Sequence, residues 1–250
     1  MKRGKQVARP TGGSNMKKGT IVHIDYDLYN ADTELLLETT SEEVAKENDI
    51  HDERRAYKPM ITVIGDGRLI KGFEEHLEGA KEKEEYTFDI EPEDAYGDRD
   101  GNLVETVGMN VLMRSVRDPE TLAIGSQVEI NGRTGTLQMA RAGRARIDYN
   151  HPLAGVKLRY TYTIVKVVKQ KKARVETLLE MNTGRDDFDV KFDKENVTIT
   201  LPESIAYDQN WPYAKFSLVR TLREHLNVAT VIFREVHEPP KIEEEERHQT

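Results

Sequence analysis

Three stretches of the sequence alternate apolar and polar residues, and they lie on both sides of a segment with a different texture. The alternation runs over Thr20–Tyr29, Tyr86–Ile90 and Lys157–Val168. A period of two residues is typical of a β-strand with one buried face. Between Gly97 and His151 the chain instead has short apolar runs separated by glycine-containing turns. This segment is therefore predicted to be a small lobe inserted into one β-sheet domain.

Shorter patterns complete the expected elements. Ser41, followed by two glutamates, is a good N-cap for a short helix over Glu42–Asn48. Leu69–Leu77 has apolar residues at helical spacing, and Gly79 is expected to end that helix. Within the insert, Asn131-Gly132 between two short strands predicts a type I′ hairpin. Beyond a charged linker at 170–172, helical and strand patterns alternate.

The predicted fold class is α+β, in separate lobes. An antiparallel sheet domain wraps on a short helix, carries an inserted small β-rich domain, and is followed by a C-terminal α+β domain. The expected boundaries are a disordered extension at 1–15, the sheet domain at 16–98 and 151–169, the insert at 99–150, the C-terminal domain at 173–237 and an acidic tail at 238–250.

Composition excludes several classes of protein. The 250-residue chain has a net charge of −8 and no cysteine, and its mean hydropathy is −0.69. The absence of cysteine excludes disulfide scaffolds and thiol catalysis, and it suits a reducing compartment such as the cytoplasm. The acidic balance argues against nucleic-acid binding. No apolar run approaches the roughly 18 residues of a membrane span.

Known catalytic motifs are absent from the sequence. There is no phosphate-binding glycine loop, no nucleophile elbow and no paired histidine spacing for zinc. The 7 histidines are scattered along the chain, so none is predicted to bind a metal. We therefore expect no metal and no cofactor, and any chemistry has to proceed without a nucleophile.

Three segments carry a specific resemblance. Val63–Glu74 reads VIGDGRLIKGFE, Ile90–Gly97 reads IEPEDAYG, and Asn150–Gly155 reads NHPLAG. In this order and spacing they resemble the FKBP-type peptidyl-prolyl isomerases, and in particular the SlyD-like members with an inserted flap domain. The likeness extends to long archaeal members with an extra C-terminal domain. It covers nearly everything after Met16.

The resemblance implies a pocket that catalyses rotation about X-Pro bonds. In the family, the backbone N–H of Ile70 anchors a substrate carbonyl, Phe73 forms the pocket floor, and Tyr96 offers its hydroxyl. Glu38 stands where Asp is usual, and Tyr160 where Phe is usual. The implied catalytic residues are Tyr26, Glu38, Ile70, Phe73, Tyr96 and Tyr160, and the implied substrate-binding residues around them are Leu37, Met60, Leu69 and Leu153.

Most of these side chains also have a simpler interpretation. At helical spacing, Leu69, Ile70 and Phe73 would be ordinary core residues, and Tyr26 and Tyr96 would be a strand aromatic and a turn aromatic. The functional interpretation is preferred because all of them fall within one ordered set of motifs.

The insert has an interpretation of its own. The resemblance implies a chaperone module that binds unfolded chains, with Val107, Met109, Leu112 and Met113 partly exposed as the binding surface. The alternative is that these residues form the core of the lobe. Val128, Ile130, Leu137 and Ile147 are expected inside.

The preferred function is a cytoplasmic peptidyl-prolyl isomerase that acts on unfolded or proline-containing polypeptides. The first alternative is a holdase chaperone whose pocket is weakened by Glu38. The second is a nucleic-acid adaptor that uses the basic N-terminus and the arginines of the insert, and the net charge opposes it.

The C-terminal domain is expected to mediate self-association. Its last helix carries many apolar residues, and the last strand adds Val231 and Phe233. An uncovered apolar face on a small domain usually indicates a partner, so a two-fold homodimer is predicted. The alternative is that the face docks on the sheet domain of the same chain. The helix residues concerned are Trp211, Phe216, Val219, Leu222 and Leu226.

Overall fold

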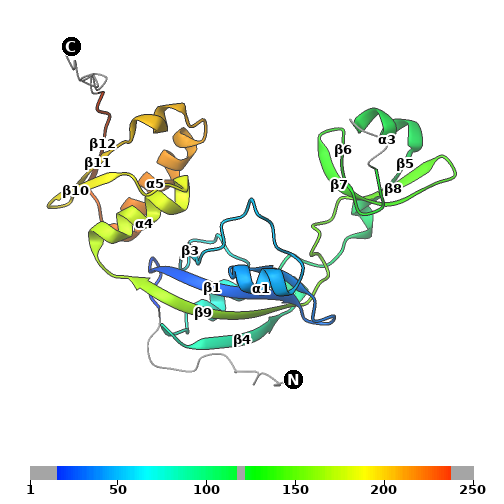
Figure 1. Cartoon of the computed structure of the whole chain (residues 1–250), viewed down its shortest axis with the longest axis horizontal. Coiled ribbons are helices and arrows are strands. Elements are labelled where there is room, and N and C mark those ends of the chain that lie inside the picture. The colour runs from blue at the N-terminus through cyan, green and yellow to red at the C-terminus, as the bar shows by residue number, and fades with distance from the viewer. Residues whose placement is uncertain (1–15, 117–121, 238–250) are drawn as a thin grey trace, which may run out of the picture.

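The computed structural model of the chain describes residues 16–116 and 122–237. Figure 1 shows a central β-sheet domain, with a small β-rich lobe and a helix-containing C-terminal domain at its opposite ends. The α+β class predicted from the sequence is confirmed. The N-terminal extension and the acidic tail predicted at the two ends of the chain lie outside the described residues.

The central sheet is antiparallel and is completed only after the insert. Its strands follow the order β2-β1-β9-β4, and β3 pairs with the part of the β1 edge that β2 leaves free. Strand β9 comes after the insert in the chain and lies between β1 and β4. Strand β4 is therefore joined to β1 only through a strand that follows the insert. The strands are β1 (Ile21–Asn30), β2 (Leu36–Thr39), β3 (Met60–Val63), β4 (Glu85–Ile90) and β9 (Leu158–Val168).

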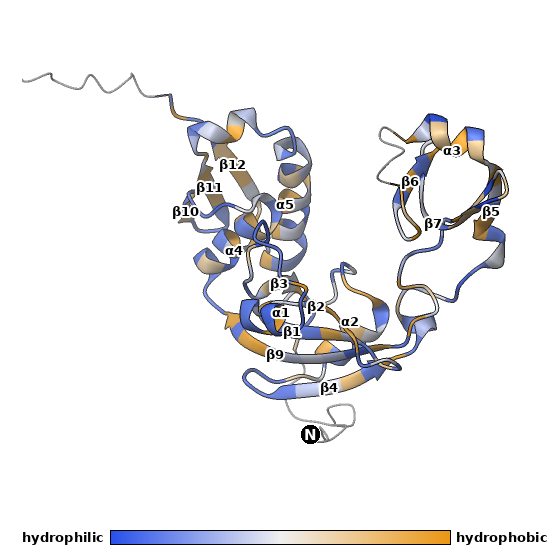
Figure 2. Ribbon diagram, turned by 45° about the vertical axis from the view of Figure 1, so that its right-hand side comes forward, coloured by the Kyte–Doolittle hydropathy of each residue, from blue (hydrophilic) through white to orange (hydrophobic). Residues whose placement is uncertain are grey.

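Two short helices accompany this sheet. Helix α1 (Glu42–Glu47) begins at Ser41, whose hydroxyl accepts a hydrogen bond from the Val44 N–H, as the capping pattern predicts. Helix α2 (Lys71–Leu77) follows Ile70 and buries Phe73 and Leu77 against the sheet. The core beneath α2 consists of alternating strand residues, which Figure 2 shows as orange stretches on β1 and β9.

The described part of the insert has a four-stranded antiparallel sheet and one α-helix. Asn131 and Gly132 both have positive φ, at 53° and 76°, as a type I′ hairpin requires. Helix α3 was not predicted from the sequence, and it makes the Met-rich run an amphipathic element. The elements are β5 (Val104–Gly108), α3 (Met109–Ser115), β6 (Gln127–Ile130), β7 (Arg133–Arg141) and β8 (Arg144–Asp148).

One prediction for the insert was wrong. Leu112 was expected to be partly exposed, but it is fully buried, because α3 turns it towards the strands. The four residues expected inside are buried with it: Val128, Ile130, Leu137 and Ile147. Val107 and Met109 are partly buried against the same cluster, while Met113 is 43% exposed.

The C-terminal domain packs two helices on a three-stranded sheet. Strands β10 and β11 are antiparallel, whereas β11 and β12 are parallel and are joined through α5. The predicted linker at 170–172 was wrong in part, because α4 begins at Lys171. The elements are α4 (Lys171–Thr183), β10 (Asp189–Asp193), β11 (Asn196–Thr200), α5 (Trp211–Leu226) and β12 (Thr230–Arg234).

This domain shares a hydrophobic core with the central domain. Ile21, Val63 and Val168 belong to the same buried cluster as the inner faces of α4 and α5. Trp211, Leu222 and Leu226 of the face expected to be uncovered are buried in that cluster, whereas Phe216 is 75% exposed. Much of this face is therefore covered within the chain.

Candidate functional site

A cavity of about 330 Å³ opens on the central domain, between the sheet and the N-terminal end of α2. All six residues predicted as catalytic line it, together with two of those predicted to bind substrate. Its lining residues are Tyr26, Glu38, Met60, Arg68, Leu69, Ile70, Phe73, Tyr96 and Tyr160. Leu37 and Leu153 pack against the neighbouring core but do not line the cavity.

The floor of the cavity is formed by buried aromatic side chains. Phe73 is 1% exposed and stacks on Tyr160, with 4.4 Å between ring centroids. Tyr26 on β1 tilts against Tyr160 at 5.8 Å. Beneath Phe73, the Tyr162 ring makes an edge contact at 5.2 Å, and its hydroxyl lies 2.8 Å from Nδ1 of His76. The floor is therefore held by the core of the domain.

Tyr160 stands where the resemblance implies phenylalanine, and it lines the cavity. No residue within 16–116 and 122–237 forms a hydrogen bond with this hydroxyl, and it is not among the fully buried unpaired atoms. Burial raises the pKa of Tyr160, so the hydroxyl stays protonated at neutral pH. The substitution thus adds a polar atom to an otherwise apolar floor.

Glu38 lines the cavity and forms an ion pair with Arg55. Burial raises the pKa of Tyr26, and the neighbouring Glu38 carboxylate raises it further. The same carboxylate accepts a hydrogen bond of 2.8 Å from Arg55. The extra methylene of Glu relative to Asp therefore does not prevent the contact with Tyr26.

The turn before α2 leaves one backbone donor free. Gly67 has φ of +73°, a conformation that side chains disfavour. Glu74 Oε1 accepts hydrogen bonds from the N–H groups of Gly67 and Leu69 and so fixes the turn. The carbonyl of Ile70 accepts the first bonds of α2, while its own N–H has no acceptor among the described residues. Ile70 therefore presents a donor at the cavity.

Tyr96 lies at the rim and is 36% exposed. Its ring stacks on His151, with 3.9 Å between centroids and an angle of 4° between the planes. Burial raises the pKa of Tyr96, and Glu38 adds to this effect, so its hydroxyl remains a donor at neutral pH. His151 follows the return from the insert, and the stacking therefore joins two of the sequence motifs.

Arg68 is the lining residue that the sequence analysis missed as a site residue. Its guanidinium donates to Asp66 Oδ2 at 2.8 Å and to Ser217 Oγ at 2.8 Å. Ser217 belongs to the C-terminal domain, 149 positions along the chain. A local motif gives no signal for such a contact, because the contact depends on how α5 docks.

The described part of the chain also bears on other classes of site. It contains no helix that is long and apolar enough to cross a membrane. Within it, the one trio of metal-ligating side chains, Asp66, Glu224 and His225, lies outside the residues that line the cavity.

Comparison with known proteins identifies the central domain. The model of the family "FKBP-type peptidyl-prolyl cis-trans isomerase" matches residues 12–113. A short-type peptidyl-prolyl cis-trans isomerase of Methanocaldococcus jannaschii is 34% identical over 149 residues, which cover 60% of this chain and 92% of the relative. The chain belongs to the FKBP-type peptidyl-prolyl isomerases. It is therefore an isomerase, and the sequence prediction of the family is confirmed.

Other relatives of this FKBP-type isomerase cover different shares of its length. The FKBP-type 16 kDa isomerase of Escherichia coli is 29% identical over 112 residues, or 44% of this chain and 74% of the relative. The SlyD isomerase of Haemophilus influenzae is 25% identical over 167 residues, or 65% of this chain and 76% of the relative. The model of the family "FKBP26_C-terminal" matches residues 171–238, which begin at the first residue of α4.

Proposed function

We propose that the cavity on the central domain is the isomerase site, and that it acts on proline-containing segments of unfolded chains delivered by the insert. One observation carries this proposal: a buried aromatic floor lies next to two hydrogen-bond donors. Phe73 and Tyr160 form the floor, while the Ile70 N–H and the Tyr96 hydroxyl are the donors.

Such a site needs no covalent step. Rotation of an X-Pro bond is opposed by amide resonance, with a barrier of about 18–20 kcal/mol. The twisted amide is less polar than the planar one, so an apolar floor stabilises it better than water does. The Ile70 N–H and Tyr96 hydroxyl hold flanking carbonyls in the twisted geometry. Contacts that form mainly in the twisted state lower the barrier without tightening substrate binding.

Exposed apolar side chains support a polypeptide-binding role for the insert. Leu103, Val111, Met113 and Ile124 are all at least 36% exposed, and Ile124 is 70% exposed. Side chains of this kind adapt to many partners. An unfolded chain held there reaches the cavity at a raised effective concentration.

The holdase alternative depends on a cavity damaged by Glu38. The closeness of the Glu38 carboxylate to Tyr26 argues against that damage, and all six catalytic candidates line one cavity. We therefore keep isomerisation as the primary role and holding as the role of the insert.

Two further proposals concern the cellular location and the oligomeric state of the protein. A cytoplasmic location is supported by the absence of cysteine. Self-association through the C-terminal domain is supported by Tyr213 and Phe216, which are 79% and 75% exposed. Sedimentation of the full chain beside a Phe216→Ser variant tests the dimer, which is rejected if the wild type remains a monomer at micromolar concentration.

Substitution of the donor and the floor tests the proposed site. Tyr96→Phe should lower turnover of an X-Pro peptide, because it removes the hydroxyl donor. Phe73→Ala should also lower turnover and should cost about 3–5 kcal/mol of stability, because it empties a buried position. Tyr207→Phe is the matched control, since Tyr207 is 84% exposed and lies outside the site. Wild-type turnover by folded Tyr96→Phe and Phe73→Ala variants would refute the assignment.

A further inference from the structure

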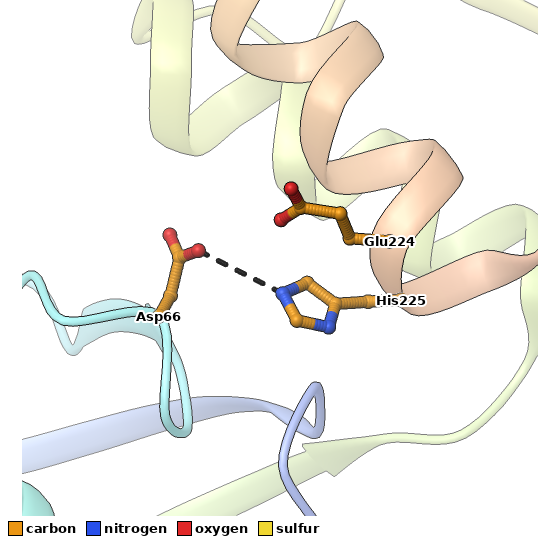
Figure 3. A group of neighbouring side chains, drawn as sticks. All are labelled: Asp66, Glu224 and His225. Atoms are coloured by element: carbon orange, nitrogen blue, oxygen red, sulfur yellow. Dashed lines mark ion pairs between the residues drawn. The ribbon is translucent and has the colours of Figure 1, made fainter.

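Three ligand-type side chains meet where the C-terminal domain docks on the central domain. Asp66, Glu224 and His225 each offer one ligand atom, and these atoms lie within 4.8 Å of one another (Figure 3). Asp66 belongs to the turn after β3, whereas Glu224 and His225 lie in the last turn of α5. The group therefore exists only when the two domains are together.

The side chain of His225 is largely buried, and one of its ring nitrogens lacks a hydrogen bond among the described residues. Its side chain is only 10% exposed, and its Nε2 atom is buried with no hydrogen bond among the described residues. This atom faces Oδ1 of Asp66 at 3.7 Å, which is too long for a hydrogen bond. Buried polar atoms are nearly always satisfied in proteins, so an orphaned imidazole nitrogen requires an explanation.

The carboxylates are arranged to complete a site around this nitrogen. The side chain of Asp66 is 5% exposed. Its Oδ2 accepts a hydrogen bond of 2.8 Å from Arg68, and its Oδ1 faces His225. Glu224 is exposed and, as Figure 3 shows, extends its carboxylate towards the same space. Two partly buried ligands and one exposed ligand leave a path for an ion from solvent.

The backbone around His225 is fixed by interdomain contacts. Arg174 donates to the carbonyl of Gly19 at 2.7 Å and to the carbonyl of His225 at 3.3 Å. A Cβ at Gly19 would lie 2.7 Å from the His225 ring, so the ring packs directly on the turn that precedes β1. The imidazole is thus held in place by its surroundings.

One imidazole and two carboxylates form a donor set that suits a borderline divalent cation. Zn²⁺ accepts histidine nitrogen and carboxylate oxygen at about 2.0–2.2 Å and takes water as a fourth ligand. Around a tetrahedral ion, ligand atoms are about 3.4 Å apart, so the observed group is slightly more open. Since Glu224 is exposed, a change of its rotamer supplies most of the closure.

We propose that Asp66, Glu224 and His225 form a Zn²⁺ site that fastens the C-terminal domain to the turn at the rim of the isomerase cavity. The ion would bind only the docked arrangement and would therefore stabilise it by mass action. Asp66 also holds Arg68, which lines the cavity. A single side chain, that of Arg68, therefore links the proposed zinc site to the cavity.

Zinc titration of the full-length chain tests the proposal. After treatment with a chelator, the protein is titrated with Zn²⁺ in competition with a chromophoric indicator, and melting temperatures are recorded with and without the ion. One saturable equivalent and a raised melting temperature are expected. Glu224→Gln and His225→Gln should each weaken binding about tenfold or more, which is at least the loss seen for outer-shell partners of metal sites. Glu224 is exposed, so its variant remains informative if His225→Gln destabilises the fold.

His237→Gln is the matched control, because His237 belongs to the same domain, is 70% exposed and lies 4.0 Å from Glu235. It should bind Zn²⁺ like the wild type. The proposal is overturned if no saturable equivalent binds, if Glu224→Gln binds as tightly as the wild type, or if the control loses as much affinity as the site variants. The pair of Asp66 and His225 would then be an interdomain ion pair only.

Discussion

The insert and the C-terminal domain are attached to the central domain in different ways. The buried cluster of the insert contains residues of the insert alone. The buried cluster of the C-terminal domain includes Ile21, Val63 and Val168 of the central domain. One appendage has its own core, while the other completes its core with the sheet domain.

The contacts at the base of the insert are polar. Asn150 exchanges hydrogen bonds of 2.9 Å with the backbone of Asp100, and Arg99 pairs with the buried carboxylate of Asp148. Reorienting the insert about this base exposes little apolar surface, whereas moving the C-terminal domain exposes a hydrophobic core. The insert is therefore suited to follow a flexible substrate, and the C-terminal domain to brace the cavity.

Removal of the C-terminal domain should have the largest effect. A chain that ends at Lys169 exposes Ile21, Val63 and Val168, which are at most 4% exposed in the structure. Each fully buried side chain of this size contributes about 1.5–3 kcal/mol, so the central domain should lose about 5 kcal/mol or more. Urea unfolding followed by circular dichroism measures the loss. A truncated chain within about 1 kcal/mol of the full-length central domain would contradict the shared core.

Single leucine substitutions sharpen the same comparison. Leu112 in the insert and Leu222 in the C-terminal domain are both fully buried, and replacing either with alanine should cost about 2–5 kcal/mol. The location of the loss should differ. Hydrogen exchange should show faster opening of β1 in Leu222→Ala, but only of insert strands in Leu112→Ala. Equal effects of the two variants on β1 would remove the distinction.

A smaller effect is expected on the pH dependence of the unfolding free energy, near the C-terminal domain. Burial lowers the pKa of His23, Lys166 and Lys58 lower it further, and Glu180 opposes them. The folded chain thus takes up a proton less readily than the unfolded chain. Stability from neutral His23 is present above its ordinary pKa of 6.5 and declines as the pH falls below it.

The variant His23→Gln isolates this contribution. Between pH 7 and pH 5, the unfolding free energy of the variant should fall less than that of the wild type. The difference between the two should be about 0.5 kcal/mol or less, because the ring is partly solvated. The residues 99–150 of the insert contain no histidine, so no matching effect is expected there. An identical pH dependence in the variant and the wild type would rule out this role of His23.

The sequence predicted the local elements well where periodicity and capping agree. The alternation over Thr20–Tyr29 and the cap at Ser41 corresponded to β1 and α1. It failed at α3, because a Met-rich run without a side-chain cap or an acidic first turn gives no start signal for a helix. It also placed a linker where α4 begins, because charged residues are equally compatible with an exposed helical turn.

The candidate site was predictable through motifs, and its long-range parts were not. Ile70, Phe73 and Tyr96 fall within the segments that resemble the family motifs, and they line one cavity. The part played by Arg68 depends on Ser217, and the Asp66 group depends on α5. Contacts between distant segments are set by domain docking, which no single-sequence pattern encodes. The shared core is missed for the same reason.

Replacement of residues 99–150 by a short loop tests the central claim most directly. The ends of the insert lie close together, since the Gly155 N–H donates to the carbonyl of Gly97 at 2.8 Å, so the central domain should remain folded. Turnover of a short X-Pro peptide should persist, while catalysis of proline-limited refolding of a protein should fall sharply. An equal loss of both activities in a folded variant would contradict separate roles for the cavity and the insert.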